Sequence, residues 1–283
     1  MTSQQGTGGE NSIPHVLSCL EGEMDKLFLL RYDTERKSSE EMAGFFEQVV
    51  AVHRADDIPA TFFCTGGAIE ARESDFRAFY EAVKEDALFD IQDHSYSHIG
   101  LGYEAGKPVE VLKADYDRSF AVHERVFGKR PIGLSVCGTS GADGQRLSGF
   151  DQTEKSQTEF AMVADLGVRM INATLTGKRE SHDFINYGSL GYPDIMGFPS
   201  AYSDTSWMYR KTHGDPLDFV LSVIDERADQ NAQLPLMLHD WVAWNHASDQ
   251  ALTHVRQIVD YARKKGYTAV SHAWCLKETS LWK

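Results

Sequence analysis

Two histidines stand four residues apart in the segment Asp93-His94-Ser95-Tyr96-Ser97-His98. This spacing predicts both imidazoles on one face of the turn that begins a helix, where a single divalent metal ion can take two nitrogen ligands. Asp33, much earlier in the chain, offers the anionic ligand that such a pair lacks. Two histidines and one carboxylate leave positions open for water and substrate, which is more typical of catalysis than of structure. A chance pair among eleven histidines is the competing explanation.

The segments that would position these residues alternate between short apolar runs and longer amphipathic stretches. This pattern indicates a parallel sheet covered by helices. Strands are predicted at residues 26–32, 60–64, 88–92, 132–136, 168–174, 234–238 and 267–270, and helices at 38–54, 69–85, 109–127, 153–166, 216–227 and 249–265. Seven or so such units imply an α/β barrel. Residues 139–149 and 177–215 predict loops at the rim of the site, the second with a short strand at 195–198.

Three candidate residues fall at the ends of predicted strands. In a parallel barrel the catalytic groups project from the carboxyl ends of the strands. Asp33 ends the first strand, His94 follows the third, and His239 follows the run 234–238. All three therefore lie on one rim, which strengthens the prediction of a metal site.

Composition limits the class of protein. With 283 residues, 42% hydrophobic and 25% charged, the chain is that of one large globular domain. A net charge of -14, spread along the chain, argues against nucleic acid or an anionic membrane as partner. The four cysteines are widely separated, which favours buried free thiols over disulfides. We read no signal peptide and no membrane span, and we expect a cytoplasmic protein with residues 1–24 as a partly flexible extension and 25–283 as the domain.

Several phrases together resemble the polysaccharide deacetylases of the NodB-homology type, carbohydrate esterase family 4. The run at 58–63, the His94-Ser95-Tyr96-Ser97-His98 motif, the late Leu238-His239-Asp240 and the phrase at 128–131 occur in the family's order. The resemblance implies a distorted (β/α)7-type barrel in a single domain. It also implies a divalent metal ion, zinc or else cobalt or nickel, and hydrolytic removal of an acyl group from a sugar.

Two positions depart from the family pattern. The family's first motif carries two aspartates, a general base and a metal ligand, but here Arg31 stands where the base is expected and Asp33 matches the ligand. Arginine does not accept a proton near neutral pH. The arginine that holds the base in the family is also missing, since the aligned stretch begins at Ser135. The chain therefore lacks both the expected base and the arginine that holds it, which fits either a reorganised active site or an inactive one.

The resemblance and the residue types assign roles as follows. Asp33, His94 and His98 hold the metal, whose bound water is the nucleophile, and His239 protonates the leaving nitrogen. Arg31 is expected to bind an anionic oxygen of the substrate or the developing oxyanion, with a salt bridge to Glu35 or Asp93 as the structural alternative. The substitute base is left open among Glu35, Asp93, Asp240 and the substrate.

Other polar and aromatic residues have supporting roles. Asp93 is expected to bind a ligand histidine from behind, and Asp240 to orient a ring or cap the next segment. Trp207, Trp241 and Trp244 are candidates for an apolar wall against a sugar ring, with core packing as the alternative.

The sequence therefore predicts a metal-dependent hydrolase that removes an acetyl or formyl group from the nitrogen of a sugar or glycan precursor. Two alternatives stay open: hydrolysis of another C–N bond, such as an allantoin-like amide, and an inactive barrel that binds metal or sugar. The expected partner is the small-molecule or glycan substrate. A homo-oligomer is compatible with the sequence, which does not give the oligomeric state.

Overall fold

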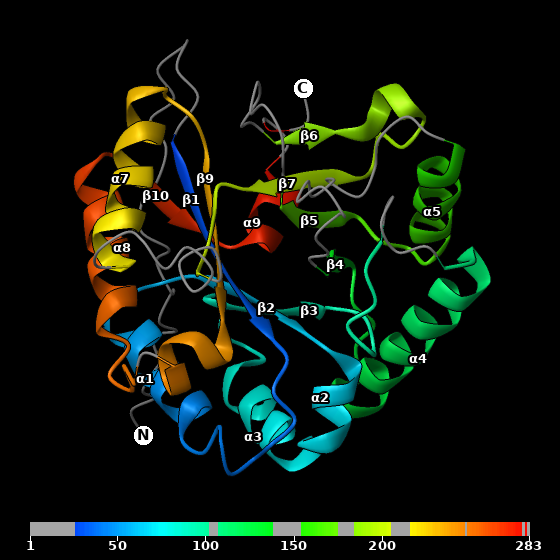
Figure 1. Ribbon diagram of the computed structural model, residues 1–283, viewed down its shortest axis with the longest axis horizontal. Coiled ribbons are helices and arrows are strands. Elements are labelled where there is room, and N and C mark those ends of the chain that lie inside the picture. Colours follow the sequence, from blue (N-terminus) through cyan, green and yellow to red (C-terminus); the bar gives the residue numbers. More distant parts are fainter. Residues whose placement is uncertain are drawn as a thin grey trace, which may run out of the picture.

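A computed structural model describes residues 26–101, 107–137, 154–174, 184–204, 216–246, 248–278 and 281. Within them, ten strands form one curled sheet (Figure 1). The strands are β1 (Leu27–Thr34), β2 (Ala60–Cys64), β3 (Phe89–Asp93), β4 (Gly133–Ser135), β5 (Met170–Thr174), β6 (Ile185–Asn186), β7 (Met196–Ser200), β8 (Tyr202–Ser203), β9 (Leu234–His239) and β10 (Thr268–Val270).

The strand order is β6-β7-β5-β4-β3-β2-β1-β9-β8, with β10 also paired to β1. All pairings are parallel except that of β6 with β7. In the described part of the chain the ring of pairs does not close, because β8 and β6 stand at its two ends. This arrangement is an α/β barrel, as the alternating pattern predicts, and it is distorted, as the resemblance implies.

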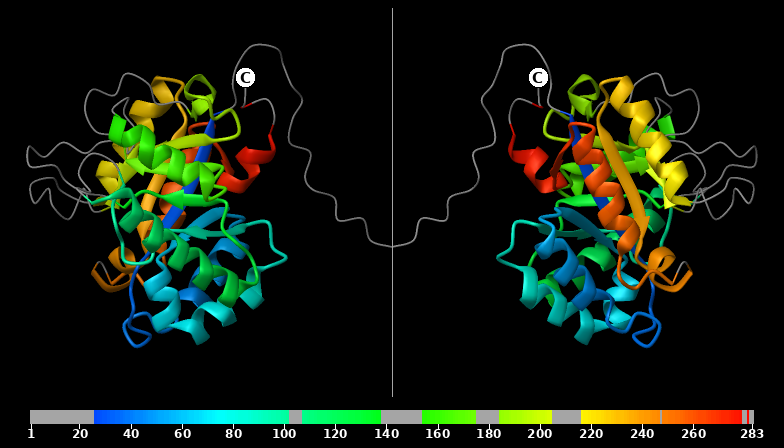
Figure 2. Two further views of the ribbon diagram at one scale, coloured as in Figure 1. Left: turned by 90° about the vertical axis from the view of Figure 1, so that its right-hand side faces the viewer. Right: turned by 90° about the vertical axis from the view of Figure 1, so that its left-hand side faces the viewer.

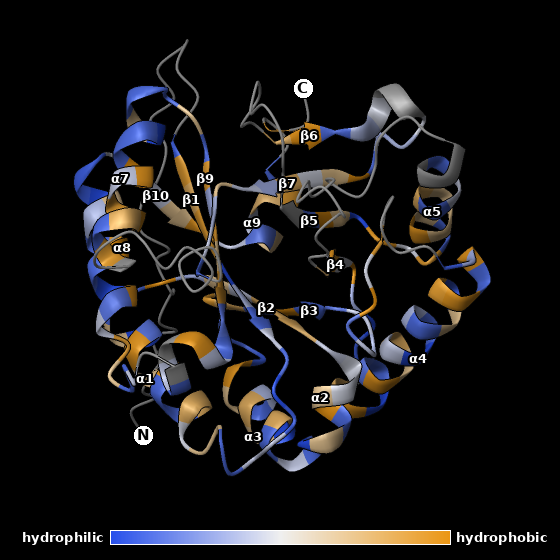
Figure 3. Cartoon of the chain, viewed as in Figure 1, coloured by the Kyte–Doolittle hydropathy of each residue, from blue (hydrophilic) through white to orange (hydrophobic). Residues whose placement is uncertain are grey.

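Helices cover the outside of the sheet, as Figure 2 shows from two sides. They are α1 (Phe45–Ala55), α2 (Gly66–Ala71), α3 (Glu73–Val83), α4 (Val109–Phe127), α5 (Glu154–Asp165), α7 (Pro216–Asp229) and α8 (Thr253–Lys264). Helix α9 (His272–Lys277) instead packs Cys275 and Leu276 into the inner core with Leu27 and Leu29. Figure 3 shows hydrophobic residues along β9 and the first half of β1, whereas much of α7 is hydrophilic. No helix among the described residues is both long and apolar enough to cross a membrane.

Strand β1 divides its side chains between two environments. Side chains alternate across a strand, so every second residue shares a face. Phe28, Leu30 and Tyr32 pack into the large outer core with the helices, whereas Leu27 and Leu29 join the core inside the barrel. The inner face continues with the next alternate residues, Arg31 and Asp33, and both are buried. The inside of the barrel is therefore apolar at the start of β1 and charged at its end.

Some predicted boundaries were wrong. The predicted helix at 69–85 is two helices, α2 and α3, because Arg72 between them has φ -121° and ψ 39°. The predicted helix at 38–54 begins only at Phe45, after Gly44 with φ 80°. Sequence reasoning missed α9, β6 and β8, and the short strand expected at 195–198 is the full sheet member β7. The predicted loop at 139–149 and the N-terminal extension lie outside the described residues.

Candidate active site

The candidate site lies where β1, β3 and β9 end. Asp33 is the residue before the end of β1, His94 directly follows β3, and His239 is the last residue of β9. In the parallel register, Asp33 pairs with Phe63 on one side and with His239 on the other. The structure thus brings together the three strand ends on which the sequence prediction relied.

The segment that carries His94 and His98 is an irregular loop and not the start of a helix, so that prediction was wrong. Ser95 and His98 have φ values of 58° and 61°, which an α-helix does not contain. The two imidazoles nevertheless meet, with ring centroids 5.0 Å apart and planes at 80°. His94 is buried, whereas the His98 side chain is 43% exposed. The loop therefore presents one imidazole from the interior and one from the surface.

Asp93 holds this loop in shape. Its carboxylate accepts hydrogen bonds from the Ser95 amide at 2.7 Å and from the Ser119 hydroxyl of α4. Burial raises the pKa of Asp93 to about 7. The expectation that Asp93 binds a ligand histidine from behind does not match this geometry, because His94 Nδ1 bonds the carbonyl oxygen of Ser135 at 2.9 Å instead.

Glu35 lies at the centre of the site. Its Oε1 is 3.3 Å from His94 Nε2, 3.0 Å from His98 Nε2 and 3.7 Å from His239 Nε2. Burial would raise the pKa of Glu35, but hydrogen bonds from His94 and His98 outweigh it and lower the pKa. Three imidazole nitrogens therefore point at one carboxylate oxygen.

Asp240 supports Glu35 through the backbone. Its Oδ1 accepts the Glu35 amide at 3.3 Å, and the Asp240 side chain is buried. Burial, and then the charge of Glu35, raise the pKa of Asp240 to about 7. The residue after the strand-end histidine thus fixes the loop that follows β1.

Arg31 pairs with the predicted metal ligand itself. Its Nη2 lies 3.3 Å from Asp33 Oδ2, and both side chains are almost fully buried. The salt bridge expected with Glu35 or Asp93 is therefore a salt bridge with Asp33. Among the described residues, Arg31 Nε and Nη1 have no hydrogen-bond acceptor, and the guanidinium lies 5.7 Å from the centre of the Phe63 ring. Ser135 Oγ also donates to Asp33 Oδ2 at 3.3 Å.

His239 is held by Asp204, a residue that sequence reasoning missed. Asp204 Oδ1 lies 2.6 Å from His239 Nδ1, and its Oδ2 accepts the His239 amide at 2.7 Å. Burial would lower the pKa of His239, but the Asp204 carboxylate raises it to about 9. Little in the sequence pattern indicated this role of Asp204, because the residue follows the two-residue strand β8 inside a segment predicted as a loop.

The tryptophans proposed as an apolar wall for a sugar ring lie in different environments. Trp241 lies at the site, with its ring 5.8 Å from that of His239 and the Arg36 guanidinium 4.4 Å from its centre. Trp244 is buried and packs edge-on against Phe45, as core residues do. Trp207 lies outside the described residues.

The residues present can hold a divalent metal ion. Two groups of three side chains offer ligand atoms within 4.8 Å of one another: Asp33 with Glu35 and His94, and His94 with His98 and Cys137. The predicted triad of Asp33, His94 and His98 is thus divided between two groups that share His94. The bond from His94 Nδ1 to the Ser135 carbonyl directs Nε2 toward the carboxylates, as is usual for a ligand imidazole.

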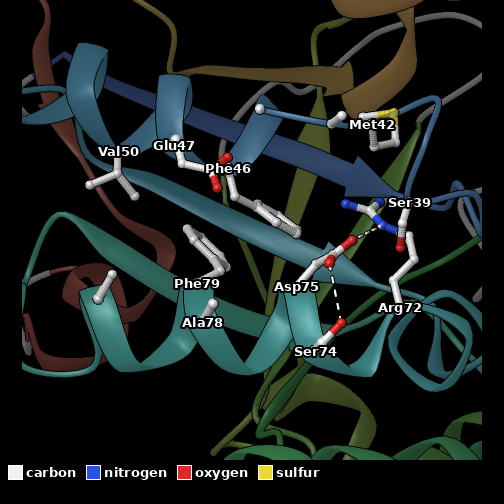
Figure 4. Close-up of a pocket in the computed structure, with 13 residues that line it drawn as sticks. Ser39, Met42, Phe46, Glu47, Val50, Arg72, Ser74, Asp75, Ala78 and Phe79 are labelled. Carbon is white, nitrogen blue, oxygen red and sulfur yellow. Dashed lines mark hydrogen bonds and ion pairs between the residues drawn. The ribbon is translucent and has the colours of Figure 1, made fainter.

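A separate cavity of about 650 Å³ lies between α1 and α3 (Figure 4). Its lining includes Phe46, Phe79 and Arg72, whose Nε is 3.2 Å from Asp75. None of its lining residues belongs to the candidate site. The cavity is therefore separate from the side chains that would do chemistry.

Comparison with known proteins agrees with the motifs. The sequence profile of the family described as polysaccharide deacetylase matches residues 24–143, which include Asp33, Glu35, His94 and His98. No curated protein matches the sequence. Residues 24–143 are therefore similar to the polysaccharide deacetylase family, and they lack the base aspartate and the arginine partner that this resemblance leads us to expect.

Solved structures confirm the barrel. A Mycobacterium smegmatis protein named as a polysaccharide deacetylase is 11% identical with a TM-score of 0.67, covering 95% of this chain and 94% of that one. The chitin deacetylase of Colletotrichum lindemuthianum is 16% identical with a TM-score of 0.56, covering 88% and 86%.

One similar structure is a pseudoenzyme of carbohydrate esterase family 4 from Bacillus anthracis, in a mutant form with restored activity. It is 12% identical with a TM-score of 0.53, covering 89% of this chain and 68% of that one. At these identities the likeness establishes the fold alone.

Proposed function

We propose that this protein is a metal-dependent hydrolase that removes an N-acetyl or N-formyl group from a sugar or glycan precursor. The observation that carries the proposal is the convergence of three imidazoles on Glu35, next to Asp33, at the ends of three parallel strands. Similarity of residues 24–143 to the polysaccharide deacetylase family supports acyl transfer to water as the reaction.

Asp33, His94 and His98 are the proposed metal ligands, and Glu35 lies within reach of the same ion. Zinc is the proposed metal, with cobalt or nickel as substitutes, because imidazole and carboxylate ligands suit these ions. When bound, such an ion supplies a Lewis acid that polarises the acyl carbonyl and favours ionisation of water.

His239 is the proposed general acid. Asp204 fixes its Nδ1, so Nε2 faces the centre of the site, 3.7 Å from Glu35. With a pKa of about 9, the imidazole still carries its proton at neutral pH. It gives that proton to the amine nitrogen as the C–N bond breaks, so the products are a carboxylic acid and a free amine.

Glu35 is the proposed substitute for the missing base. It is the candidate that reaches the site, because Asp93 is turned into the loop and Asp240 is buried behind the Glu35 backbone. A water molecule that adds to the acyl carbon passes its proton to the Glu35 carboxylate. Water at the carbonyl, Glu35 as acceptor and His239 as donor complete the proton balance of the hydrolysis.

Arg31 is proposed as a charge partner of Asp33. Its side chain is 1% exposed, so its guanidinium faces Asp33 and not the solvent from which a substrate arrives. The expectation that Arg31 binds an anionic oxygen of the substrate has less support from this geometry.

The buried Arg31–Asp33 pair also favours one alternative, a barrel that binds metal or sugar without turnover. A double variant, Arg31→Asp with Ser135→Arg, restores the two residues expected from the family pattern. It distinguishes the hydrolase from the inactive barrel. Activity in the wild-type protein supports the hydrolase, whereas activity only in the double variant supports the inactive barrel. Hydrolysis of an allantoin-like amide uses the same groups and belongs in the same substrate screen.

The test starts with the metal content of the purified protein, measured by mass spectrometry. We expect about one equivalent in the wild type and little in the His94→Ala, His98→Ala double variant. His254→Ala, which changes a surface histidine beside Asp249, is the matched control and should keep its metal. Release of acetate or formate from N-acyl sugars is then assayed with that metal supplied. A wild type that takes up no divalent ion contradicts the proposal. The cytoplasmic location and homo-oligomer stay predictions.

A further inference from the structure

Two cationic side chains, Arg36 and Lys37, directly follow Glu35 in the chain and have no part in the proposed mechanism. Both are exposed. Among the described residues neither forms an ion pair, whereas Arg118 on the neighbouring helix α4 is bound to Glu70 at 3.1 Å. The chain as a whole carries a net charge of -14. Two unpaired cations beside the candidate site are therefore available to an anionic ligand.

Arg36 is held in place at two points. Its guanidinium carbon lies 4.4 Å from the centre of the Trp241 ring, and its carbonyl oxygen accepts a hydrogen bond from Nη1 of the buried Arg72 at 3.1 Å. A guanidinium stacked on a ring keeps the N–H groups along its edge free, and their fork matches two oxygens of a carboxylate or phosphate. The Trp241 ring lies 5.8 Å from that of His239, so one indole separates Arg36 from the proposed acid.

Lys37 lies beside the loop that carries the two histidines. A β-carbon at Gly67 would lie 3.1 Å from Lys37 Cε and 2.9 Å from the carbonyl oxygen of Tyr96. Tyr96 stands between His94 and His98 in the sequence of that loop. The absence of a side chain at Gly67 therefore leaves room for the lysine against the loop, where its ammonium group lies at the rim of the site.

Resting on the proposed function, we propose that Arg36 and Lys37 bind an anionic substituent of the N-acyl sugar. The substrate class is then a sugar that carries a phosphate or a carboxylate, and not a neutral glycan. Each exposed cation contributes modestly, because water and salt screen its charge. Together the two should favour an anionic sugar over its neutral parent by about tenfold.

The test is calorimetric binding of three sugars to the zinc-loaded, full-length protein with His239→Gln, which lacks the proposed acid and leaves the sugars intact. The probes are N-acetylglucosamine, its 6-phosphate, and N-acetylmuramic acid, which carries a carboxylate. We expect one of the acidic sugars to bind about tenfold more tightly than the neutral sugar at low salt. Adding Arg36→Gln and Lys37→Gln should reduce this preference to less than about twofold and leave the affinity for the neutral sugar unchanged. The matched control, Lys264→Gln with Lys277→Gln, removes two exposed charges at the ends of α8 and α9 and should keep the preference.

The outcomes separate this inference from the proposed function. The acidic sugar that is preferred identifies the anion as phosphate or carboxylate. Equal affinity for neutral and acidic sugars overturns the inference and leaves the hydrolase intact. A preference that persists without Arg36 and Lys37 also overturns it, because the anion then binds the metal ion or another group. Binding of none of the three sugars overturns the inference as well, whereas the proposed function is judged by acetate or formate release from N-acyl sugars in the wild type.

Discussion

Replacing Asp204 with asparagine should release His239 from its most direct electrostatic partner. The asparagine side chain retains an oxygen that can accept the His239 amide, so the backbone contact can persist while the negative charge is lost. The pKa of His239 is raised from 6.5 to about 9, against the effect of burial, with Asp204 as the largest favourable cause. That shift corresponds to about 3 kcal/mol of preference for the imidazolium. Without Asp204, burial remains, and we expect the pKa to fall to about 6.5 or below.

The consequence for catalysis follows from the proton on Nε2. At about pH 8, the protonated fraction of His239 should fall about 30-fold in Asp204→Asn, and a rate that needs this acid should fall with it. Because the pKa is raised in the folded protein, the proton is present at neutral pH and lost as pH rises through about 9. The descending limb of the pH–rate profile should therefore move to lower pH in the variant.

The direct assay is an NMR titration of the histidine ring carbons, with the His239 signal assigned by its loss in His239→Gln. Asp249→Asn is a matched control, since Asp249 lies 3.6 Å from another histidine, His254. A His239 pKa near 6.5 in the wild type, or one that does not move in Asp204→Asn, would refute the reasoning.

Three further predictions concern stability, each measured as the free energy of unfolding in urea. Arg31→Met should destabilise the protein by about 3 to 5 kcal/mol, because it leaves the Asp33 carboxylate buried without its cation. Adding Asp33→Asn should recover much of this loss. If the free-energy losses of the two single variants simply add in the double variant, the pairing is contradicted. Burial lowers the pKa of His53 from 6.5 to about 4, so the unfolded chain binds the extra proton first and stability falls as pH drops between these values. His53→Gln should reduce this acid-induced loss of unfolding free energy by about 3 kcal/mol. A variant with the same pH dependence of stability as the wild type would contradict the prediction. Thr65→Ala should cost about 1 kcal/mol, because the Thr65 hydroxyl accepts the Ala68 amide at the start of α2, and no loss would show that this cap is not stabilising.

The sequence predicted most strands and the rim on which Asp33, His94 and His239 meet. Those predictions depended on local patterns: apolar runs that end in a polar residue, and the rule that parallel strands present their carboxyl ends together. The resemblance to a family added the distortion of the barrel and the divergence at Arg31. Residues brought together by strand ends were therefore accessible to sequence reasoning.

The missed features depend on contacts between distant segments. Asp204 reaches His239 only because β8 pairs with β9, and two residues of strand give almost no periodic signal. The partner of Arg31 is Asp33 because both face the barrel interior, where no other described carboxylate forms an ion pair with that guanidinium. The break at Arg72 leaves helical spacing nearly intact, since α3 resumes one residue later. The central position of Glu35 depends on Asp240, more than two hundred residues away in sequence.

Strand β1 is held by backbone hydrogen bonding to β2, β9 and β10. Backbone ladders do not depend on which side chain stands at position 31, so the register of β1 does not itself dictate the residue there. Changes at this site therefore act through the charge balance of the buried side chains, with the strand pairing left in place. A structure with a TM-score of 0.67 at 11% identity shows how far side chains can differ on this scaffold while the fold is kept.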